Sequence, residues 1–532
     1  MNSRNIIKTA LLTCLIVAGT ACNKEQFNIN SNPDSVTDVS VTPSVLLPGA
    51  EQATSSNIAS EYWFLGWWMG HGARSGSYQS FTEEETYAFT NDFHVGIWNG
   101  LYANANNYNI MINKAKESGA GTYEAIGRIM KSHNFQILTD IYGNIPYTEA
   151  FLGTANATPK YDKAVDIYKG IFADLDAAIA LLNNVAANDL AKNPDIATAD
   201  LIYKGNTVKW KKFANTLRLR MLVHLHNGVI STTVAPGISV AEQVAKITSD
   251  GFLGAGEDAT LNPAFNGSKP SPYFRFWDTN ESGSGSQRDW ARASDYAVKY
   301  YKANGDPRID AFFVSPNGTT AGQKGIVFGT PAGGAAPIGS ALSTVRGPGL
   351  SPGGASSRAW ILTSAESFFL QAEARERGVI TTGPAANELL TLGIYESFSF
   401  LGLKTQGPNV NQNADDYLAY NAGYPDVDYA APSIVAGQPG GGLYTILSQK
   451  WFALNTIAPF EVWTDYRRTG ITYGAGSGFT AGPTLSADPG NSAISIPVRL
   501  FYPQNEYNYN AANVSAEGTI NVFTGKLFWD LN

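Results

Sequence analysis

The stretch from Trp98 to Phe151 constrains the fold more than any other part of the 532-residue chain, because it predicts two helices joined by a short glycine turn. In the first helix, apolar residues recur at three- and four-residue steps and therefore share one face. These residues are Trp98, Leu101, Tyr102, Ala105, Tyr108 and Ile112. Gly119 and Gly121 mark the turn, and the second helix stops at Gly143. Two helices joined so closely are antiparallel neighbours that cannot bury both faces alone, so further helix pairs are expected.

Amphipathic patterns elsewhere in the chain predict a mainly α fold built from repeated helix pairs. The four predicted pairs lie near residues 98–142, 161–227, 357–403 and 443–468. Stacked helix pairs form a curved solenoid, although the spacing fits no strict tetratricopeptide consensus. A further helix is expected from Leu46 to about Gly70, and a short strand is expected near Phe528 and Trp529.

Residues near 251–356 differ from this helical pattern, because they are rich in Gly, Ser, Pro and Asn with scattered aromatic residues. Only Ala291 to Ala303 is predicted to be helical there. Long irregular segments inside a compact domain are uncommon and are usually functional. We therefore interpret 251–356 as a loop-rich, ligand-facing insert within a single domain that spans 42–532.

The N-terminus predicts a lipoprotein signal peptide over residues 1–21. Arg4 and Lys8 precede an apolar run from Thr9 to Ala18, which is shorter than the ~20 residues that a membrane span needs. Small residues then precede Cys22, so we expect cleavage before Cys22 and lipid on its thiol. An ordinary signal peptide followed by an incidental cysteine is the alternative. Residues 22–41 are polar and predict a flexible tether.

Charge and composition exclude some partners. The formal net charge is −8, and the chain has no basic cluster, so nucleic acid is not an expected partner. Only Cys14 and Cys22 are present, and Cys14 would leave with the signal peptide. The mature chain would then hold no internal disulfide.

Catalytic residues are not expected from the sequence. The run Glu83–Glu85 is interpreted as a solvated turn, since adjacent side chains do not face one another. A glycosidase needs two carboxylates about 5–10 Å apart in a cleft, and Glu366 and Glu373 could share one helix face, but nearby arginines favour structural ion pairing. His224 and His226 point in opposite directions on a helix and cannot ligate one metal together. We therefore predict no catalytic residue, no metal site and no cofactor.

A binding surface is the remaining prediction. Aromatic planes stack on the C–H faces of sugars, while Asn, Asp and Arg hydrogen-bond to the hydroxyl groups. The loops supply such candidates, namely Tyr78, Phe81, Tyr273, Trp277, Asp278, Asn280, Arg288 and Trp290. Each aromatic residue taken alone is also compatible with core packing. We hypothesise that Trp277 or Trp290 is a stacking platform.

Several blocks of sequence together resemble the SusD/RagB family of nutrient-binding outer-membrane lipoproteins. They occur in the family's order and span most of the mature chain: NSNPDSV, LLPGA, WNGLYANANNYNIMINKA, HNFQILTDIYGNIPYTEAF, YDKAVDIYKGIFADLDAAIALL, VKWKKFANTLRLRML, ESFFLQAEARERG, QKWFALNTIAPFEVWTDYRRTG and VRLFYPQNEYNYNAANV. The form of the first and last blocks is similar to that of the second SusD-like subfamily. The glycine-rich middle of the chain has no counterpart that we can place.

The resemblance implies four tetratricopeptide-like helix pairs that form one side of the protein, with loops and small helices packed on it. It also implies a lipid-anchored protein on the outer membrane of a Gram-negative bacterium, facing the cell exterior. Such proteins bind an oligosaccharide or another small nutrient and deliver it to a SusC-like TonB-dependent transporter. Two alternatives stay open, a lipid-anchored glycan hydrolase and a helical adaptor that closes the transporter without a ligand of its own.

Overall fold

The computed structural model describes residues 41–80, 82–226, 237–279, 287–319, 322–333, 336–337, 339–345, 354–403, 413–432, 442–474 and 482–530. The signal peptide, Cys22, the tether up to residue 40, Phe81 and Asn280 lie outside these described residues. One compact unit spans Pro43–Asn532 and is mainly helical, which confirms the predicted fold class. Among the described helices, none combines the length and apolar character that a membrane-spanning helix requires.

The first two predicted helix pairs are present and pack as a continuous layer. Their helices are α5 (Val95–Ser118), α6 (Gly121–Tyr142), α7 (Ala164–Asn183) and α9 (Thr207–Leu225). Gly119 takes the left-handed conformation (φ 70°) that lets the chain reverse between α5 and α6. α6 packs against both α5 and α7, and α7 packs against α9, while α2 (Pro43–Ser60) covers α5.

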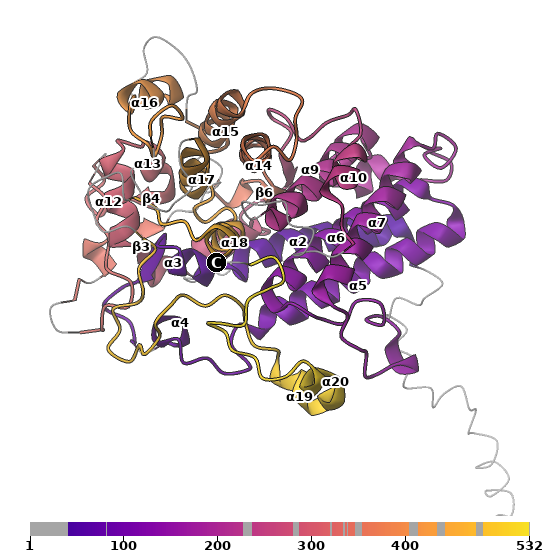
Figure 1. The fold of residues 1–532 in the computed structure, drawn as a ribbon, viewed down its shortest axis with the longest axis horizontal. Coiled ribbons are helices and arrows are strands. Elements are labelled where there is room, and N and C mark those ends of the chain that lie inside the picture. The colour runs from indigo at the N-terminus through magenta and orange to yellow at the C-terminus, as the bar shows by residue number, and fades with distance from the viewer. Residues whose placement is uncertain are drawn as a thin grey trace, which may run out of the picture. The chain divides into compact units, whose positions relative to one another are not determined.

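The last two pairs continue from α9, next to which their first helix lies in Figure 1. They comprise α14 (Ser364–Glu376), α15 (Ala386–Phe400), α17 (Gly442–Ala453) and α18 (Pro459–Thr469). α14 and α15 pack closely on each other, but α17 packs mainly on α14 and α15, and α18 packs mainly on α3 (Trp63–Trp68). The fourth pair therefore connects the helical scaffold to the N-terminal aromatic segment.

Short strands and short helices make up the rest of the described unit. One sheet has the strand order β1-β3-β5-β4, and a second sheet pairs β2 with β6. The strands are β1 (Gly72–Arg74), β2 (Ala259–Leu261), β3 (Ala291–Ala293), β4 (Phe313–Val314), β5 (Thr344–Val345) and β6 (Ala359–Leu362). The remaining α-helices are α4 (Glu83–Thr86), α8 (Ile196–Ala199), α10 (Val240–Ala245), α11 (Pro272–Trp277), α12 (Asp295–Ala303), α13 (Arg308–Phe312), α16 (Ala414–Tyr420), α19 (Gln504–Tyr509) and α20 (Ala511–Ala516).

Within 251–356 the structure also holds the helices α11 and α13, which the sequence did not predict, and three further predictions differ from these elements. The helix predicted from Leu46 to Gly70 is broken into α2 and α3, and the intervening Tyr62 is buried against Phe460. The helix predicted over Ala291–Ala303 begins only at Asp295, where the Ser294 hydroxyl accepts a hydrogen bond from the Ala297 amide. The residues before it pair with β1 instead.

The third difference concerns the C-terminal tail, where Phe528 and Trp529 form a turn rather than the predicted strand. The Trp529 indole is fully buried and donates to the carboxylate of Asp140 at 2.8 Å. Phe528 packs edge-on against Tyr168. Side-chain packing against α6 and α7, rather than pairing with another strand, therefore holds the tail.

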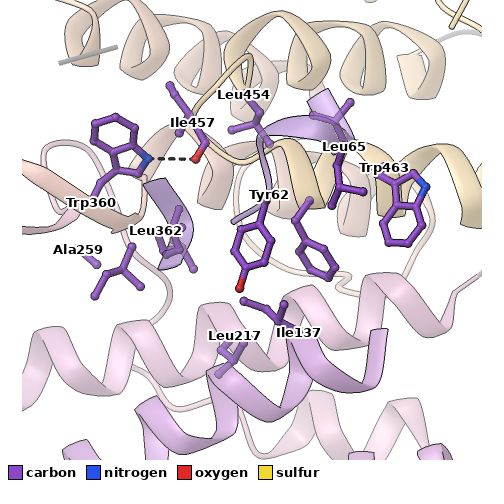
Figure 2. Packing of buried hydrophobic residues seen from close by; sticks show 14 of the residues in the cluster. Tyr62, Leu65, Ile137, Leu217, Ala259, Trp360, Leu362, Leu454, Ile457 and Trp463 are labelled. Atoms are coloured by element: carbon purple, nitrogen blue, oxygen red, sulfur yellow. Dashed lines mark hydrogen bonds between the residues drawn. The ribbon is translucent and has the colours of Figure 1, made fainter. Parts of the chain in front are cut away.

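The hydrophobic core runs between the scaffold and the short elements. Figure 2 shows side chains from several distant segments converging there, among them Tyr62, Leu65, Ile137, Leu217, Trp360, Leu454, Ile457 and Trp463. The Trp360 indole donates to the carbonyl of Ile457 at 3.0 Å, as Figure 2 also shows. This bond joins β6 to the turn between α17 and α18.

Charged side chains are also buried and paired within the scaffold. Nδ1 and Nε2 of His224 lie 3.1 Å from the carboxylates of Asp140 and Glu461, respectively. Burial lowers the pKa of His224, but the two carboxylates outweigh it and raise the pKa overall. Arg468 contacts Glu373 at 2.5 Å and Asp465 at 2.6 Å. These pairs join α6, α9, α14 and α18 through charge-assisted hydrogen bonds.

Candidate ligand-binding surface

Pairing between β1 and β3 brings two predicted site segments together. The strands are antiparallel, with Arg74 opposite Ala291, so the loop after β1 adjoins the residues before β3. The Ser75 amide donates to the Trp290 carbonyl at 2.8 Å, which extends the pairing beyond the strands. The structure therefore places Tyr78 in the loop that adjoins Arg288 and Trp290. Figure 1 shows β3 next to α3 and α12.

Arg74 fixes the loop that carries Tyr78. Its guanidinium donates to the Tyr78 carbonyl at 2.6 Å and to the Thr330 carbonyl at 3.0 Å. It also forms an ion pair with the buried Glu85 at 3.0 Å. A side chain held at several points has little freedom, so the backbone around Tyr78 is held in one conformation.

The interpretation of Glu83–Glu85 as a solvated turn is therefore wrong for part of the run. Glu85 is fully buried and paired with Arg74, and Glu84 lies 3.1 Å from Nε2 of His94. The short helix α4 separates the three side chains, so that neighbouring glutamates reach different partners. Glu85 therefore anchors the Tyr78 loop through Arg74, and its buried carboxylate cannot contact a ligand.

Tyr78 is the exposed aromatic residue of this surface, with 40% of its area accessible. Arg288 and Asp278 form an exposed ion pair at 3.3 Å, and Arg288 also lies 3.5 Å from Asp289. Arg292 lies between the Tyr78 loop and the Arg288 segment, and its guanidinium donates a hydrogen bond to the Arg288 carbonyl. Burial lowers the pKa of Arg292, while the neighbouring Tyr78 and Asp289 oppose that shift. Exposed aromatic rings and charged hydrogen-bonding groups are the kinds of side chain that can contact the C–H faces and hydroxyl groups of a sugar.

Trp290 stands behind this patch and is only partly buried. Its ring makes edge-on contacts with Trp63 at 5.1 Å and with Trp67 at 5.0 Å between ring centroids. Such contacts between aromatic rings are favourable and fix the orientation of each ring. Trp290 therefore forms a rigid border of the patch, with part of its surface still accessible.

The structure places two other candidates in the core. Tyr273 is fully buried and its ring stacks on that of Trp360, while Trp277 has 3% of its area exposed and contacts Phe276 edge-on. Both residues belong to α11, whose apolar face packs against α2. Neither ring exposes a face to a ligand in this structure. Of Trp277 and Trp290, the two residues considered as stacking platforms, only Trp290 is therefore accessible.

A hollow of about 210 Å³ lies next to this patch on the other side of Trp67. Trp67, Tyr296 and Phe328 contribute to its wall, and Asp295 and Lys299 form an ion pair at 2.6 Å in its lining. The segment from Ile326 to Thr330 runs from the hollow to Arg74, where Thr330 accepts a hydrogen bond. The sequence offered no sign of this hollow, because its lining comes from segments far apart in the chain.

The carboxylates considered for hydrolysis are buried and paired. Glu366 and Glu373 have at most 1% of their area exposed. Glu366 lies 2.5 Å from Arg220, and Glu373 contacts Arg468 and Arg377 at 2.5 and 2.6 Å. A general acid or nucleophile has to reach the substrate, which these side chains do not. Within the described part of the chain, no three potential metal-ligating side chains form a group.

Comparison with known proteins agrees with the fold and identifies the family. A family model described as "Starch-binding associating with outer membrane", SusD-like_2, matches residues 34–503. The match covers most of the chain, so this protein belongs to the SusD-like family, in the second SusD-like group. Among curated protein sequences, no relative matches this chain.

Solved structures share the fold across almost the whole chain. A chitin-binding SusD homologue from Flavobacterium johnsoniae is 23% identical, with a TM-score of 0.66, and the match covers 91% of this chain and 99% of that one. A SusD homologue from Bacteroides fragilis is 21% identical, with a TM-score of 0.67 and coverage of 92% and 100%. A SusD homologue from Bacteroides uniformis is 23% identical, with a TM-score of 0.68 and coverage of 92% and 99%.

Proposed function

We propose that this protein binds an oligosaccharide at the surface formed by Tyr78, Asp278, Arg288 and Trp290. The observation that carries the proposal is the exposed Tyr78 ring, on a loop that Arg74 fixes and that pairs through Ser75 with the segment carrying Arg288 and Trp290. A ring that is already fixed loses little conformational freedom on binding, so more of the contact energy contributes to affinity. The hollow beside Trp67 gives a bound chain room to continue past the patch.

The family description supports a sugar as the ligand, because the SusD-like_2 model is described as starch-binding. The Flavobacterium johnsoniae homologue is described as chitin-binding. Starch and chitin both present flat C–H faces and hydroxyl groups, which match an aromatic ring bordered by charged side chains. Oligosaccharides of these two classes are therefore the first probes to use.

We further propose that the protein acts at the outer membrane, anchored by lipid on Cys22 and facing the cell exterior. The family description includes association with the outer membrane, and the N-terminal sequence fits a lipoprotein signal. In this role the protein passes its ligand to a SusC-like TonB-dependent transporter. Metabolic labelling with palmitate tests the anchor, and an unlabelled mature chain would contradict it.

Tyr78→Ala tests the binding surface directly. We expect the variant to lose about tenfold in affinity for the oligosaccharide that the wild-type protein binds, since an aromatic contact of this kind contributes about 1–1.5 kcal/mol. Tyr78→Phe keeps the ring and should bind within about twofold of wild type. Tyr420→Ala, which removes a tyrosine 70% exposed on α16, is the matched control and should leave affinity unchanged. Isothermal titration calorimetry measures all four proteins.

Unchanged binding by a folded Tyr78→Ala protein would place the ligand elsewhere. Shortening of the oligosaccharide during the titration would instead favour the hydrolase alternative. If the wild-type protein bound none of the probes but was recovered with an outer-membrane barrel, the adaptor alternative would replace the proposal.

A further inference from the structure

A small cavity lies beside Trp63 and Trp67, where four segments of the chain meet. It is lined by Trp67 of α3, His71 in the turn before β1, Trp277 of α11 and Thr456 in the turn between α17 and α18, with Trp63 and Pro459 completing the apolar part. Its volume is about 10 Å³. A single buried water molecule needs about 10–15 Å³, so the cavity admits one water molecule and nothing larger.

Each of the four polar side chains has an atom that lacks a hydrogen-bond partner within the described part of the chain. These atoms are Nε1 of Trp67, Nδ1 of His71, Nε1 of Trp277 and Oγ1 of Thr456, and all are fully enclosed. The side chains of Trp67, His71 and Trp277 are at least 97% buried. Buried polar atoms are nearly always satisfied by protein or by ordered water, so four of them around one cavity point to a shared partner.

The hydrogen-bonding roles of the four atoms are fixed by their surroundings. The Nε2 atom of His71 lies 3.2 Å from the Trp451 carbonyl, which can only accept, so Nε2 carries the proton and Nδ1 is an acceptor. Burial lowers the pKa of His71 to about 3, which keeps the ring neutral. Both indoles can only donate, and the threonine hydroxyl can accept.

This set of groups selects a neutral molecule with two donors and two acceptors. A cation would be repelled by the two indole N–H groups, and an anion would face the lone pair of His71. Water can accept from both indoles and donate to Nδ1 and Oγ1, which satisfies every group at once.

The backbone around the cavity is shaped to admit this arrangement. A Cβ at Gly72 would stand 2.4 Å from Nε1 of Trp67, so only glycine lets this indole reach the cavity. Thr456 has a φ of 56°, which is unfavourable for a β-branched residue and persists only when its surroundings require it. A hydroxyl held at the cavity by strained backbone indicates that the hydroxyl has a partner there.

We infer that one buried water molecule occupies this cavity, accepting hydrogen bonds from Trp67 and Trp277 and donating to His71 and Thr456. The water joins the loop-rich insert, through Trp277, to the helical scaffold, through Thr456. It thereby positions Trp67, which also contributes to the wall of the 210 Å³ hollow. This inference does not depend on the identity of any ligand.

A high-resolution crystal structure of the wild-type mature chain is the first test. We expect a single water peak within hydrogen-bonding distance of at least three of the four atoms. A dry cavity, or direct hydrogen bonds between these side chains, would overturn the inference.

A double-mutant cycle is the second test and works in solution. Trp277→Phe and Thr456→Val should each lower the Tm, and the double variant should lose clearly less than the sum, because either change already breaks the water network. Trp68→Phe is the matched control, since the Trp68 indole donates directly to the Glu84 carbonyl at 3.1 Å. Its effect should add to that of Thr456→Val. Additive losses for Trp277→Phe and Thr456→Val would contradict a shared water molecule.

Discussion

Two buried carboxylates, Glu373 in the scaffold and Glu85 near the Tyr78 loop, are each paired with arginine, but their pKa values shift in opposite directions. Burial raises the pKa of Glu373, but Arg468, Arg377 and other cations outweigh it and hold the pKa well below its ordinary value. Burial likewise raises the pKa of Glu85, and there Arg74 does not fully compensate, so the pKa stays above its ordinary value. Asp488 and Glu84 add to the difference by placing negative charge near Glu85.

The same type of contact, a buried carboxylate paired with arginine, therefore serves different purposes in the two regions. In the scaffold, Glu373 contacts both Arg377 and Arg468, and its ion pair with Arg468 connects α14 to α18. Near the Tyr78 loop, a single arginine only partly compensates the burial of Glu85 and mainly fixes the direction of the loop. Loss of a partner should therefore affect global stability in the scaffold and local order in the loop.

Arg468→Met should produce the largest effect. The variant leaves Glu373 and Asp465 buried beside each other with fewer cations, which should lower the free energy of unfolding by about 3–5 kcal/mol. Urea denaturation followed by circular dichroism measures the change. Lys169→Met is the control, because its pair with Asp166 is exposed and should contribute less than about 0.5 kcal/mol. Equal losses in the two variants would remove the contrast between buried and exposed pairs.

His224→Gln should have the next largest effect and should change the pH dependence of stability. The pKa of His224 is raised in the folded protein, so its stabilising contribution is complete below about pH 6.5 and is lost as the pH rises through the folded value. Glu461 behaves oppositely, because its pKa is lowered and its contribution is lost as the pH falls through the folded value. At about pH 6 the variant should be about 1–3 kcal/mol less stable than wild type.

Thermal unfolding of wild type and His224→Gln between about pH 6 and pH 9 measures this contribution. The difference in Tm between the two proteins should shrink as the pH rises, since only the wild type loses the imidazolium. A constant difference across this range would mean that His224 stays neutral and acts only through packing.

Glu85→Gln should have the smallest effect on global stability. The introduced amide keeps hydrogen-bonding groups near Arg74 and removes a carboxylate that burial disfavours, so the free energy of unfolding should change by no more than about 1 kcal/mol. The Tyr78 loop should nevertheless loosen, because Arg74 loses its charged partner.

Amide hydrogen exchange distinguishes the local effect from the global one. Residues 75–80 should exchange faster in Glu85→Gln than in wild type, while α5 and α6 should exchange at unchanged rates. Unchanged exchange in the loop would show that its other hydrogen bonds suffice. Faster exchange throughout the protein would show that Glu85 supports the whole fold.

The helical part of the fold was predictable because its signal is local. The apolar stripe of α7, including Ile171, Phe172 and Leu175, is buried as its spacing predicts. The short elements were harder, because Ala291–Ala293 has no pattern that separates a strand from the first turn of a helix. Pairing with β1, which lies far earlier in the chain, decides its conformation.

The candidate site was predictable only in part, for a related reason. Composition drew attention to Tyr78, Arg288 and Trp290, which the structure brings to adjoining segments, and their role in binding stays a prediction. It did not separate these residues from Tyr273 and Trp277, because an aromatic residue in a loop is equally suited to packing and to binding. The anchoring role of Arg74 and Glu85 also left no mark in the sequence, since each is an ordinary charged residue.

The sequence by itself determined the family and the helix pairs, because both depend on residue types at short, regular spacing. Motifs such as DIYGNIPY and the apolar stripe from Trp98 to Ile112 need no distant partner to be read. Tertiary structure alone decided which aromatic residues are exposed and which acids are compensated. Exposure and pKa depend on every atom nearby, and in this protein those atoms come from segments that lie far apart in the chain.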